Sequence, residues 1–208
     1  MTDRDLVRSH WPVELRSAFD ALFGIDETMA DVVSRSSQPT LAAIKLAWWR
    51  ERLEELDEGK VPAEPRLQSA ASELLTRGIS GADLAGLEES WGLILRTDDQ
   101  GVFMRGVASR GPVLFNMAAR LLGMPMNDFV MDAANSFVAA DLARRGMTCL
   151  GPQKIGRSKS RAPRRARPLT AFGALARRDM RSGGPPFEPE ATPRRAWALL
   201  RHRLTGRY

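Results

Sequence analysis

The stretch LAAIKLAWWRERLEEL, residues 41–56, decides how the rest of the chain is interpreted. Its apolar residues recur in alternating steps of three and four, at Leu46, Trp49, Leu53 and Leu56. This spacing places them on one face of an α-helix. Further apolar residues widen that face, namely Ile44, Ala47 and Trp48. We therefore predict a helix that lies deep in a core, with Trp48 and Trp49 both largely buried.

The same periodicity recurs along the chain, over residues 13–35, 66–76, 82–96, 99 to about 122, 126–146, 169–180 and 191–204. No stretch alternates apolar and polar residues with a period of two, so we expect essentially no sheet. The predicted fold class is all-α. Its expected regions are a helical bundle over residues 1–148, a basic loop over 149–168, and a C-terminal helical hairpin over 169–208 that packs on the same bundle.

Composition narrows the class of protein. The chain has 208 residues, of which 43% are hydrophobic, enough for one large domain with a core. Cys149 is the only cysteine, which excludes an intramolecular disulfide framework. His10 and His202 lie near opposite ends of the chain, which argues against a common type of zinc site. No apolar run approaches the roughly 18 residues of a spanning helix. We expect a cytoplasmic protein, with peripheral membrane attachment as an open alternative.

Charge is unevenly distributed along the chain. Residues 144–208 hold 17 Lys and Arg but three acids, a net charge of +14, whereas residues 1–143 hold 14 basic and 22 acidic residues, a net charge of −8. An acidic body thus carries a basic C-terminal third. This asymmetry indicates either an anionic partner or attraction between the two parts of the chain.

Residues 151–167 are the most basic segment. They are punctuated by Gly, Pro and Ser, include no acid, and carry seven cations, namely Lys154, Arg157, Lys159, Arg161, Arg164, Arg165 and Arg167. Self-repulsion and a near absence of apolar residues predict a segment that is mobile in isolation. We expect weak attraction to an anionic membrane surface. Nucleic acid is a less favoured partner, because the segment has no aromatic residue for base stacking, and a plain solvated loop is a third alternative.

Several motifs resemble those of the squalene/phytoene synthase family. They are KLAWWRE at residues 45–51, ALF at 21–23, Pro65 ahead of a short helix, RLLG at 120–123 and an alanine-rich segment over 133–145. The tryptophan motif is the most specific of these. The likeness covers roughly residues 15–180.

This resemblance implies a truncated isoprenoid-synthase bundle around a deep apolar cavity. Active family members join two prenyl diphosphates, and two aspartate-rich helices hold magnesium ions that stabilise the leaving pyrophosphate. In this chain the first motif falls at residues 30–34 and retains only Asp31. The second motif falls at residues 145–149, where Arg145 and Cys149 replace acids. The resemblance therefore implies the fold more strongly than the activity.

Two acid pairs are the remaining candidates for metal chemistry. Glu27 and Asp31 are four residues apart, as are Asp128 and Asp132, so each pair shares a helix face. If the pairs faced each other, they could bind Mg²⁺, with Asp31, Asp128 and Asp132 as candidate catalytic residues. Solvated helix surface is the alternative. The candidate substrate-binding residues, by the family resemblance, are Trp48, Trp49, Arg50 and Arg120.

Three functional hypotheses follow. The favoured one is a synthase-like protein without magnesium chemistry and without a cofactor, which binds a lipid or a protein partner. The resembled family includes a mitochondrial respiratory complex I assembly factor, so an assembly role is one form of this hypothesis. The second hypothesis is an active prenyl transferase that uses Mg²⁺. The third is a nucleic-acid-binding protein that uses the basic C-terminal third.

Overall fold

The computed structural model describes residues 1–95, 99–147, 161–181 and 185–207. All regular elements in these ranges are helices, and the ranges contain no strand. The all-α prediction is therefore confirmed for the described part of the chain.

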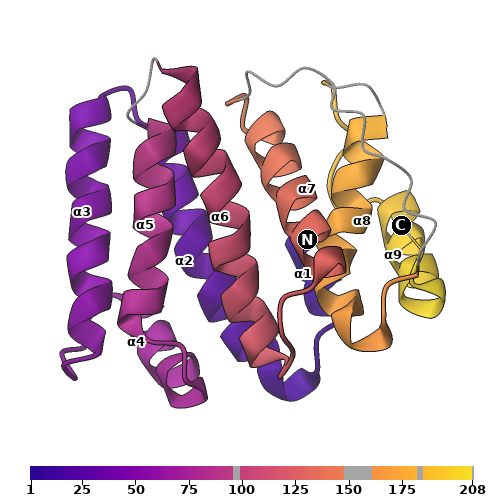
Figure 1. Ribbon diagram of the computed structural model, residues 1–208, viewed down its shortest axis with the longest axis horizontal. Coiled ribbons are helices and arrows are strands. Elements are labelled where there is room, and N and C mark those ends of the chain that lie inside the picture. Colours follow the sequence, from indigo (N-terminus) through magenta and orange to yellow (C-terminus); the bar gives the residue numbers. More distant parts are fainter. Residues whose placement is uncertain (96–98, 148–160, 182–184, 208) are drawn as a thin grey trace.

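Six helices form a continuous row (Figure 1). In order along the row they are α3 (Pro39–Leu56), α5 (Gly81–Leu95), α6 (Gln100–Leu121), α7 (Asp128–Arg144), α8 (Arg167–Arg181) and α9 (Pro193–Thr205). Each helix packs against the next one in the row. Consequently α3 and α9 lie at opposite ends of the molecule.

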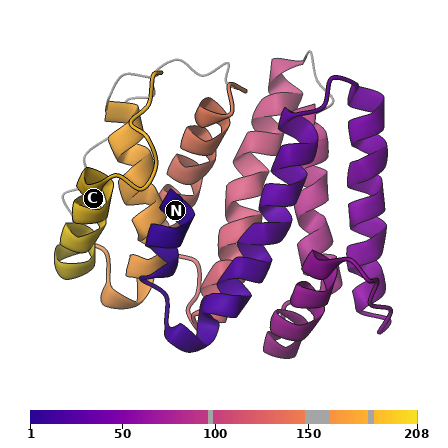
Figure 2. The same ribbon diagram turned by 180° about the vertical axis from the view of Figure 1, so that it is seen from behind.

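A second layer covers one face of this row, as the view from behind shows (Figure 2). It is formed by α1 (Asp3–Arg8), α2 (Arg16–Ser34) and α4 (Pro65–Glu73). The long helix α2 packs on α5 and α6, whereas α1 packs on α8 and α9. Short 3₁₀ turns occupy Val13–Leu15, Leu75–Arg77 and Arg164–Ala166.

Polar caps and glycines set the limits of the central helices. Asp99 accepts hydrogen bonds from the backbone N–H groups of Gly101 and Val102, at 2.7 and 3.2 Å, and so begins α6 as the sequence predicts. The side chain of Asn127 caps α7 in the same way. Gly146 follows α7 with a φ of +70°, a conformation that favours glycine and ends the helix.

The core follows the predicted stripes on α2 and α5. Buried residues recur on α2 at Phe19, Leu22, Ile25, Met29 and Val33. The stripe on α5 is buried throughout, at Leu84, Leu87, Trp91 and Ile94. Because α2 crosses the row, its stripe contacts several helices at once and forms the centre of the bundle.

The prediction for the tryptophan helix, α3, is wrong in part. Trp49 is buried at 7% exposure, but Trp48 is 42% exposed and Ile44 is 61% exposed. The helix lies at the end of the row, with α5 as its main neighbour, so it buries one stripe and leaves the adjacent one in solvent. Its wide apolar face therefore belongs to an edge helix.

The C-terminal end of the predicted basic loop is ordered. Arg164–Ala166 form a 3₁₀ turn and α8 begins at Arg167, ahead of the predicted start at residue 169. The N–H of Ala162 donates to the carbonyl of Gly206 at 2.8 Å. Arg167 donates to the carbonyl of Arg203 at 2.7 Å. These bonds attach residues 162–167 to the end of α9, so the predicted mobility does not hold for them. Lys154, Arg157 and Lys159 lie outside the described residues.

Candidate functional site

A cavity of about 530 Å³ lies between α1, α2, α7 and α8, with residues before and within α9 on one side. Its volume falls within the range of about 300–1,000 Å³ typical of small-molecule sites. Three of its lining residues are phenylalanines in mutual contact. The ring of Phe172 lies 4.8 Å from that of Phe23 and 4.9 Å from that of Phe137, measured between centroids. One wall of the cavity is therefore aromatic.

The rest of the lining is rich in charge. Eight carboxylates belong to it, namely Asp3, Asp5, Asp20, Asp26, Glu27, Asp141, Asp179 and Glu190. Four guanidiniums accompany them, those of Arg4, Arg144, Arg145 and Arg195. Most of these groups belong to two ionic clusters, one on each side of the cavity.

The inner cluster consists of Asp26, Glu27, Asp31, Arg110, Asp141 and Arg145. At its centre Arg110 of α6 is fully buried. Its guanidinium donates to both carboxylate oxygens of Asp26, at 2.9 and 2.6 Å, and to Asp141 at 2.7 Å. Trp91 adds an indole N–H to Asp26 at 2.9 Å, and its ring lies 4.0 Å from the Arg110 guanidinium carbon. The Arg110 guanidinium is thus held by ion pairs, hydrogen bonds and a cation–π contact at once.

Arg145 extends the inner cluster toward solvent. It follows the last turn of α7 and donates to Asp141 at 2.9 Å, to Glu27 at 2.9 Å and to Asp31 at 3.3 Å. One guanidinium thus joins acids from α2 and α7.

Electrostatics fix the charge state of the inner cluster. Burial alone would lower the pKa of Arg110, but the charges of Asp26 and Asp141 outweigh it and raise that pKa above its usual value. Burial would raise the pKa of Asp141, but Arg110 and Arg145 outweigh it and hold that pKa below the usual range. Both groups therefore stay ionised at neutral pH.

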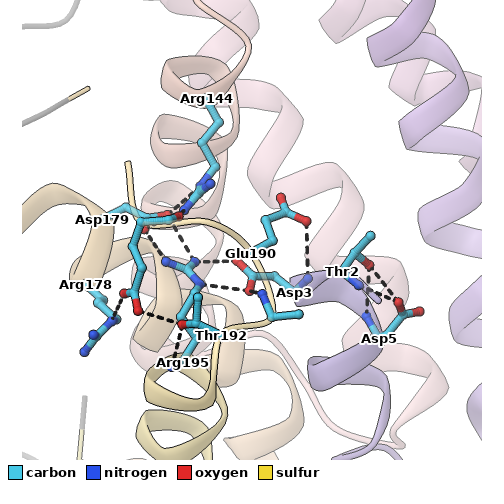
Figure 3. Close-up of polar contacts among 11 residues, drawn as sticks. Thr2, Asp3, Asp5, Arg144, Arg178, Asp179, Glu190, Thr192 and Arg195 are labelled. Atoms are coloured by element: carbon cyan, nitrogen blue, oxygen red, sulfur yellow. Dashed lines mark hydrogen bonds and ion pairs between the residues drawn. The ribbon is translucent and has the colours of Figure 1, made fainter. Parts of the chain in front are cut away.

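The outer cluster consists of Asp3, Arg144, Asp179 and Arg195, and Figure 3 shows how these side chains converge. Arg195 of α9 is 1% exposed and pairs with Asp179 of α8 and with Asp3 of α1. Arg144 of α7 donates to both oxygens of Asp179, at 2.7 and 2.8 Å. Burial opposes the charge of Arg195, but its two carboxylate partners raise its pKa above the usual value. This cluster joins four helices.

Arg4 differs from the other cations of the cavity. Within the described residues it has no ion pair, and it donates a hydrogen bond to the backbone carbonyl of Asp20, at 2.6 Å. Its guanidinium lies 5.7 Å from the ring centroid of Phe19. Burial lowers the pKa of Arg4 from its usual value, although the charges of Asp20 and Glu27 oppose this.

The two predicted acid pairs do not face each other. Glu27 and Asp31 contact Arg145 beyond the C-terminal end of α7, whereas Asp132 lies near the start of that helix and pairs with Arg177 of α8. Asp128 is exposed in the first turn of α7. Since α7 has 17 residues and a helix rises 1.5 Å per residue, roughly 25 Å separate its two ends. The hypothesis that joined these acids in one magnesium site is therefore wrong.

The predicted substrate-binding residues lie elsewhere. None of Trp48, Trp49, Arg50 and Arg120 lines the cavity. Arg50 pairs with Glu54 at 3.0 Å on the surface of α3. Arg120 pairs with Asp83 at 2.8 Å and ties α6 to α5. These arginines have structural partners on the far side of α2.

A magnesium ion does not fit the acids between α2 and α7. The guanidinium of Arg145 already occupies the position between them and donates to oxygens of Glu27, Asp31 and Asp141. A divalent cation would have to displace this positive charge. In the described ranges no group of three or more His, Cys, Asp or Glu side chains is arranged to bind a metal ion.

Sequence reasoning missed the buried members of both clusters, although a signal was present. Asp26 lies four residues after Leu22 and three before Met29, in phase with the buried stripe of α2. Arg195 likewise lies four residues before the buried Leu199. A charged residue in phase with an apolar stripe indicates a buried ion pair.

No family model, curated protein or solved structure matches the chain. None of the described helices is both long and apolar enough to cross a bilayer.

Proposed function

We propose that this protein binds an elongated, uncharged lipid, such as a prenyl alcohol, and lacks magnesium-dependent diphosphate chemistry. The observation that carries the proposal is the position of Arg145, whose guanidinium lies between the acids of α2 and α7 and pairs with three of them. The resemblance to the squalene/phytoene synthase family supplies the prenyl character of the ligand.

The charge of the lining supports a neutral ligand. Eight carboxylates and four guanidiniums line the cavity. Arg110 and Arg8, which do not line it, pair with Asp26, Asp141 and Asp20, so carboxylates outnumber guanidiniums by eight to six. A diphosphate would enter this field without a metal ion to offset its charge, and the cost would be high because the site is partly desolvated. The hydrocarbon part of a lipid gains by leaving water, at about 25 cal/mol per Å² of apolar surface buried.

The aromatic wall gives the chain of such a lipid a place to lie. Phe23 and Phe172 are 4% and 7% exposed, and both border the cavity. Ala140 and Ala176 line the same space and leave room beside the rings. A hydroxyl headgroup at the mouth could donate to a carboxylate or accept from Arg4.

Binding can be tested by calorimetric titration with farnesol and, separately, with farnesyl diphosphate. We expect farnesol to bind at least about tenfold more tightly, since about 1.4 kcal/mol of repulsion suffices for that factor. Ala176→Leu adds volume inside the cavity and should abolish binding without unfolding the chain. Arg50→Gln, which alters an exposed arginine outside the cavity, is the matched control and should bind normally. Tighter binding of the diphosphate would contradict the proposal.

Loss of chemistry needs a separate assay. With farnesyl or geranylgeranyl diphosphate and Mg²⁺, we expect no release of pyrophosphate. Turnover that disappears in Asp31→Ala or Asp128→Ala would instead favour the active prenyl transferase hypothesis.

A further inference from the structure

The outer face of α9 carries an apolar stripe that no described element covers. Trp197, Leu200 and Leu204 are 67%, 43% and 72% exposed. At 100° per residue they fall within about 60° of one another around the helix. The inner face of the same helix is buried at Arg195, Leu199 and His202. The helix therefore has two distinct faces. One packs into the protein, and the opposite one exposes apolar side chains to solvent.

Arginines surround this stripe. Arg194 and Arg201 border one edge of it on α9 and Arg203 lies beyond the other edge; all three are exposed, and α9 contains no acidic residue. A hollow of about 290 Å³ lies between α8 and α9, with Arg178, Arg181, Arg201 and Arg207 among its lining residues. The two acids that line it, Asp179 and Glu188, are both paired with arginines.

The ordered end of the basic segment adds to this charge. Ala162 and Arg167 bond to the last residues of α9, as described above, so residues 161–167 lie beside its C-terminal end. Arg161, Arg164 and Arg165 are exposed there. Apolar stripe, hollow and basic segment thus share one end of the molecule.

We propose that this end of the molecule docks on an anionic lipid bilayer, with α9 parallel to the membrane plane. Trp197, Leu200 and Leu204 enter the boundary between headgroups and acyl chains. The surrounding arginines meet lipid phosphates, and the hollow beside Arg201 accommodates a headgroup. Aromatic and leucine side chains on one face with arginines beside them are the pattern of interfacial helices. Either feature alone binds weakly, and stable attachment needs both.

A comparison within the chain favours lipid over a protein partner. The edge helix α3 also exposes an apolar stripe, at Leu41, Ile44 and Trp48. Charges of both signs surround that stripe, including Lys45, Glu51 and Glu55. The stripe on α9 has cations alone beside it, which complements a uniformly anionic surface.

The test is co-sedimentation of the full chain with vesicles of phosphatidylcholine mixed with phosphatidylglycerol, and of phosphatidylcholine alone, across a salt series. We expect binding to the anionic vesicles that weakens as salt increases. The triple variant Trp197→Ala, Leu200→Ser, Leu204→Ser should bind at least about tenfold more weakly, and so should Arg194→Gln combined with Arg201→Gln. These side chains are exposed, so melting temperatures should not change.

The matched control is Leu41→Ser, Ile44→Ser, Trp48→Ala on α3, which removes an equivalent stripe at the opposite end of the molecule and should leave vesicle binding unchanged. Equal loss in this control, equal binding to neutral vesicles, or full binding by the α9 triple variant would each overturn the proposal. Tryptophan fluorescence gives a second readout. Anionic vesicles should shift the emission to shorter wavelength in the native chain but not in Trp197→Phe, and a shift that persists in this variant would place the contact elsewhere.

Discussion

The inner and outer clusters are built from the same parts but join different portions of the chain. Each has one almost fully buried arginine, Arg110 or Arg195, that holds two aspartates. Arg110 joins α2, α6 and α7 in the middle of the bundle. Arg195 joins α9 to α8 and to Asp3, which lies 192 residues earlier in the chain. The first cluster therefore belongs to the core, and the second fastens both ends of the chain to it.

This difference predicts how much stability is lost when each cluster loses its buried arginine. A buried ion pair contributes little net stability when intact, but removal of one partner leaves an uncompensated charge. In the core that charge has no route to water short of global unfolding. At the chain ends, α1 and α9 can separate locally and solvate it.

The largest expected effect is that of Arg110→Met. Asp26 would keep its indole N–H donor but lose its countercharge, and Asp141 would keep Arg145. We expect the free energy of unfolding to fall by about 3–5 kcal/mol. Urea denaturation followed by circular dichroism measures this change.

The matched control is the double variant Arg110→Met, Asp26→Asn. It removes the stranded charge and leaves an amide oxygen for the indole N–H of Trp91. It should recover part of the lost stability. A double variant no more stable than Arg110→Met would contradict the argument from unpaired charge.

The next effect is that of Arg195→Met, after which Asp179 keeps Arg144 as its countercharge and Asp3 loses its ion pair. Local separation of α9 limits the cost, so we expect a loss of about 1–3 kcal/mol. Hydrogen exchange should increase in α1 and α9 while α6 remains protected. Uniform loss of protection across all helices would show that the outer cluster also belongs to the global folding unit.

Apolar spacing in the sequence predicted burial more accurately for the central helix α2 than for the edge helix α3. The stripe of α2 has neighbours on several sides, so its positions from Phe19 to Val33 are buried, whereas Leu15, predicted in the same stripe, is partly buried in the preceding 3₁₀ turn. On α3 a similar spacing gives one buried face and one exposed face. The reason is that α3 lies at the end of the row, where α5 covers only one of its sides. Trp48 and Trp49 are adjacent in sequence yet differ in exposure for this reason.

The site was harder to predict than the fold, because it depends on pairing between distant segments. The family resemblance drew attention to position 145, but the contacts of Arg145 with Glu27 and Asp31 depend on how the end of α7 lies against α2. Asp3 and Arg195 carry no local motif that relates them. Helical phase could have marked each residue as buried but could not have chosen its partner.

A smaller effect is a difference in pH dependence: stability near the outer cluster should change with pH more than stability near the inner cluster. Burial, with Arg203 and His202 nearby, lowers the pKa of His10 from 6.5 to about 4, and burial also lowers the pKa of His202. His202 belongs to α9 and His10 lies close to it, and both are neutral at pH 7 in the folded chain. As the pH falls, the histidine of the unfolded chain takes up its proton before that of the folded chain. The contribution of His10 to stability is therefore complete above about pH 6.5 and is lost as the pH falls toward about 4. After solvent screening we expect His10 to account for about 1 kcal/mol.

Hydrogen exchange between pH 7 and pH 4 measures this difference, once intrinsic exchange rates are corrected. Protection of α9 should decrease over this range more than protection of α6, where Arg110 stays charged. His10→Gln removes one titrating group and should reduce the dependence. A pH response confined to α6, or unchanged in His10→Gln, would rule out this assignment.

The smallest effect concerns the margin of the outer cluster, where Glu188 is bound by Arg178 and by the hydroxyl of Thr192. These hydrogen bonds lower the pKa of Glu188 from 4.5 to about 2.

A carboxylate with a lowered pKa contributes stability that is present above about pH 4.5 and is lost as the pH falls toward 2. Because both side chains of the pair remain partly exposed, at 35% and 24%, solvent screening reduces its contribution to about 0.5 kcal/mol or less. Glu188→Gln should therefore lower stability slightly at pH 7 and match the native chain near pH 2, and high salt should reduce the difference at pH 7. A loss of several kcal/mol at neutral pH would mean that Glu188, like Asp179, is an integral partner in the outer cluster.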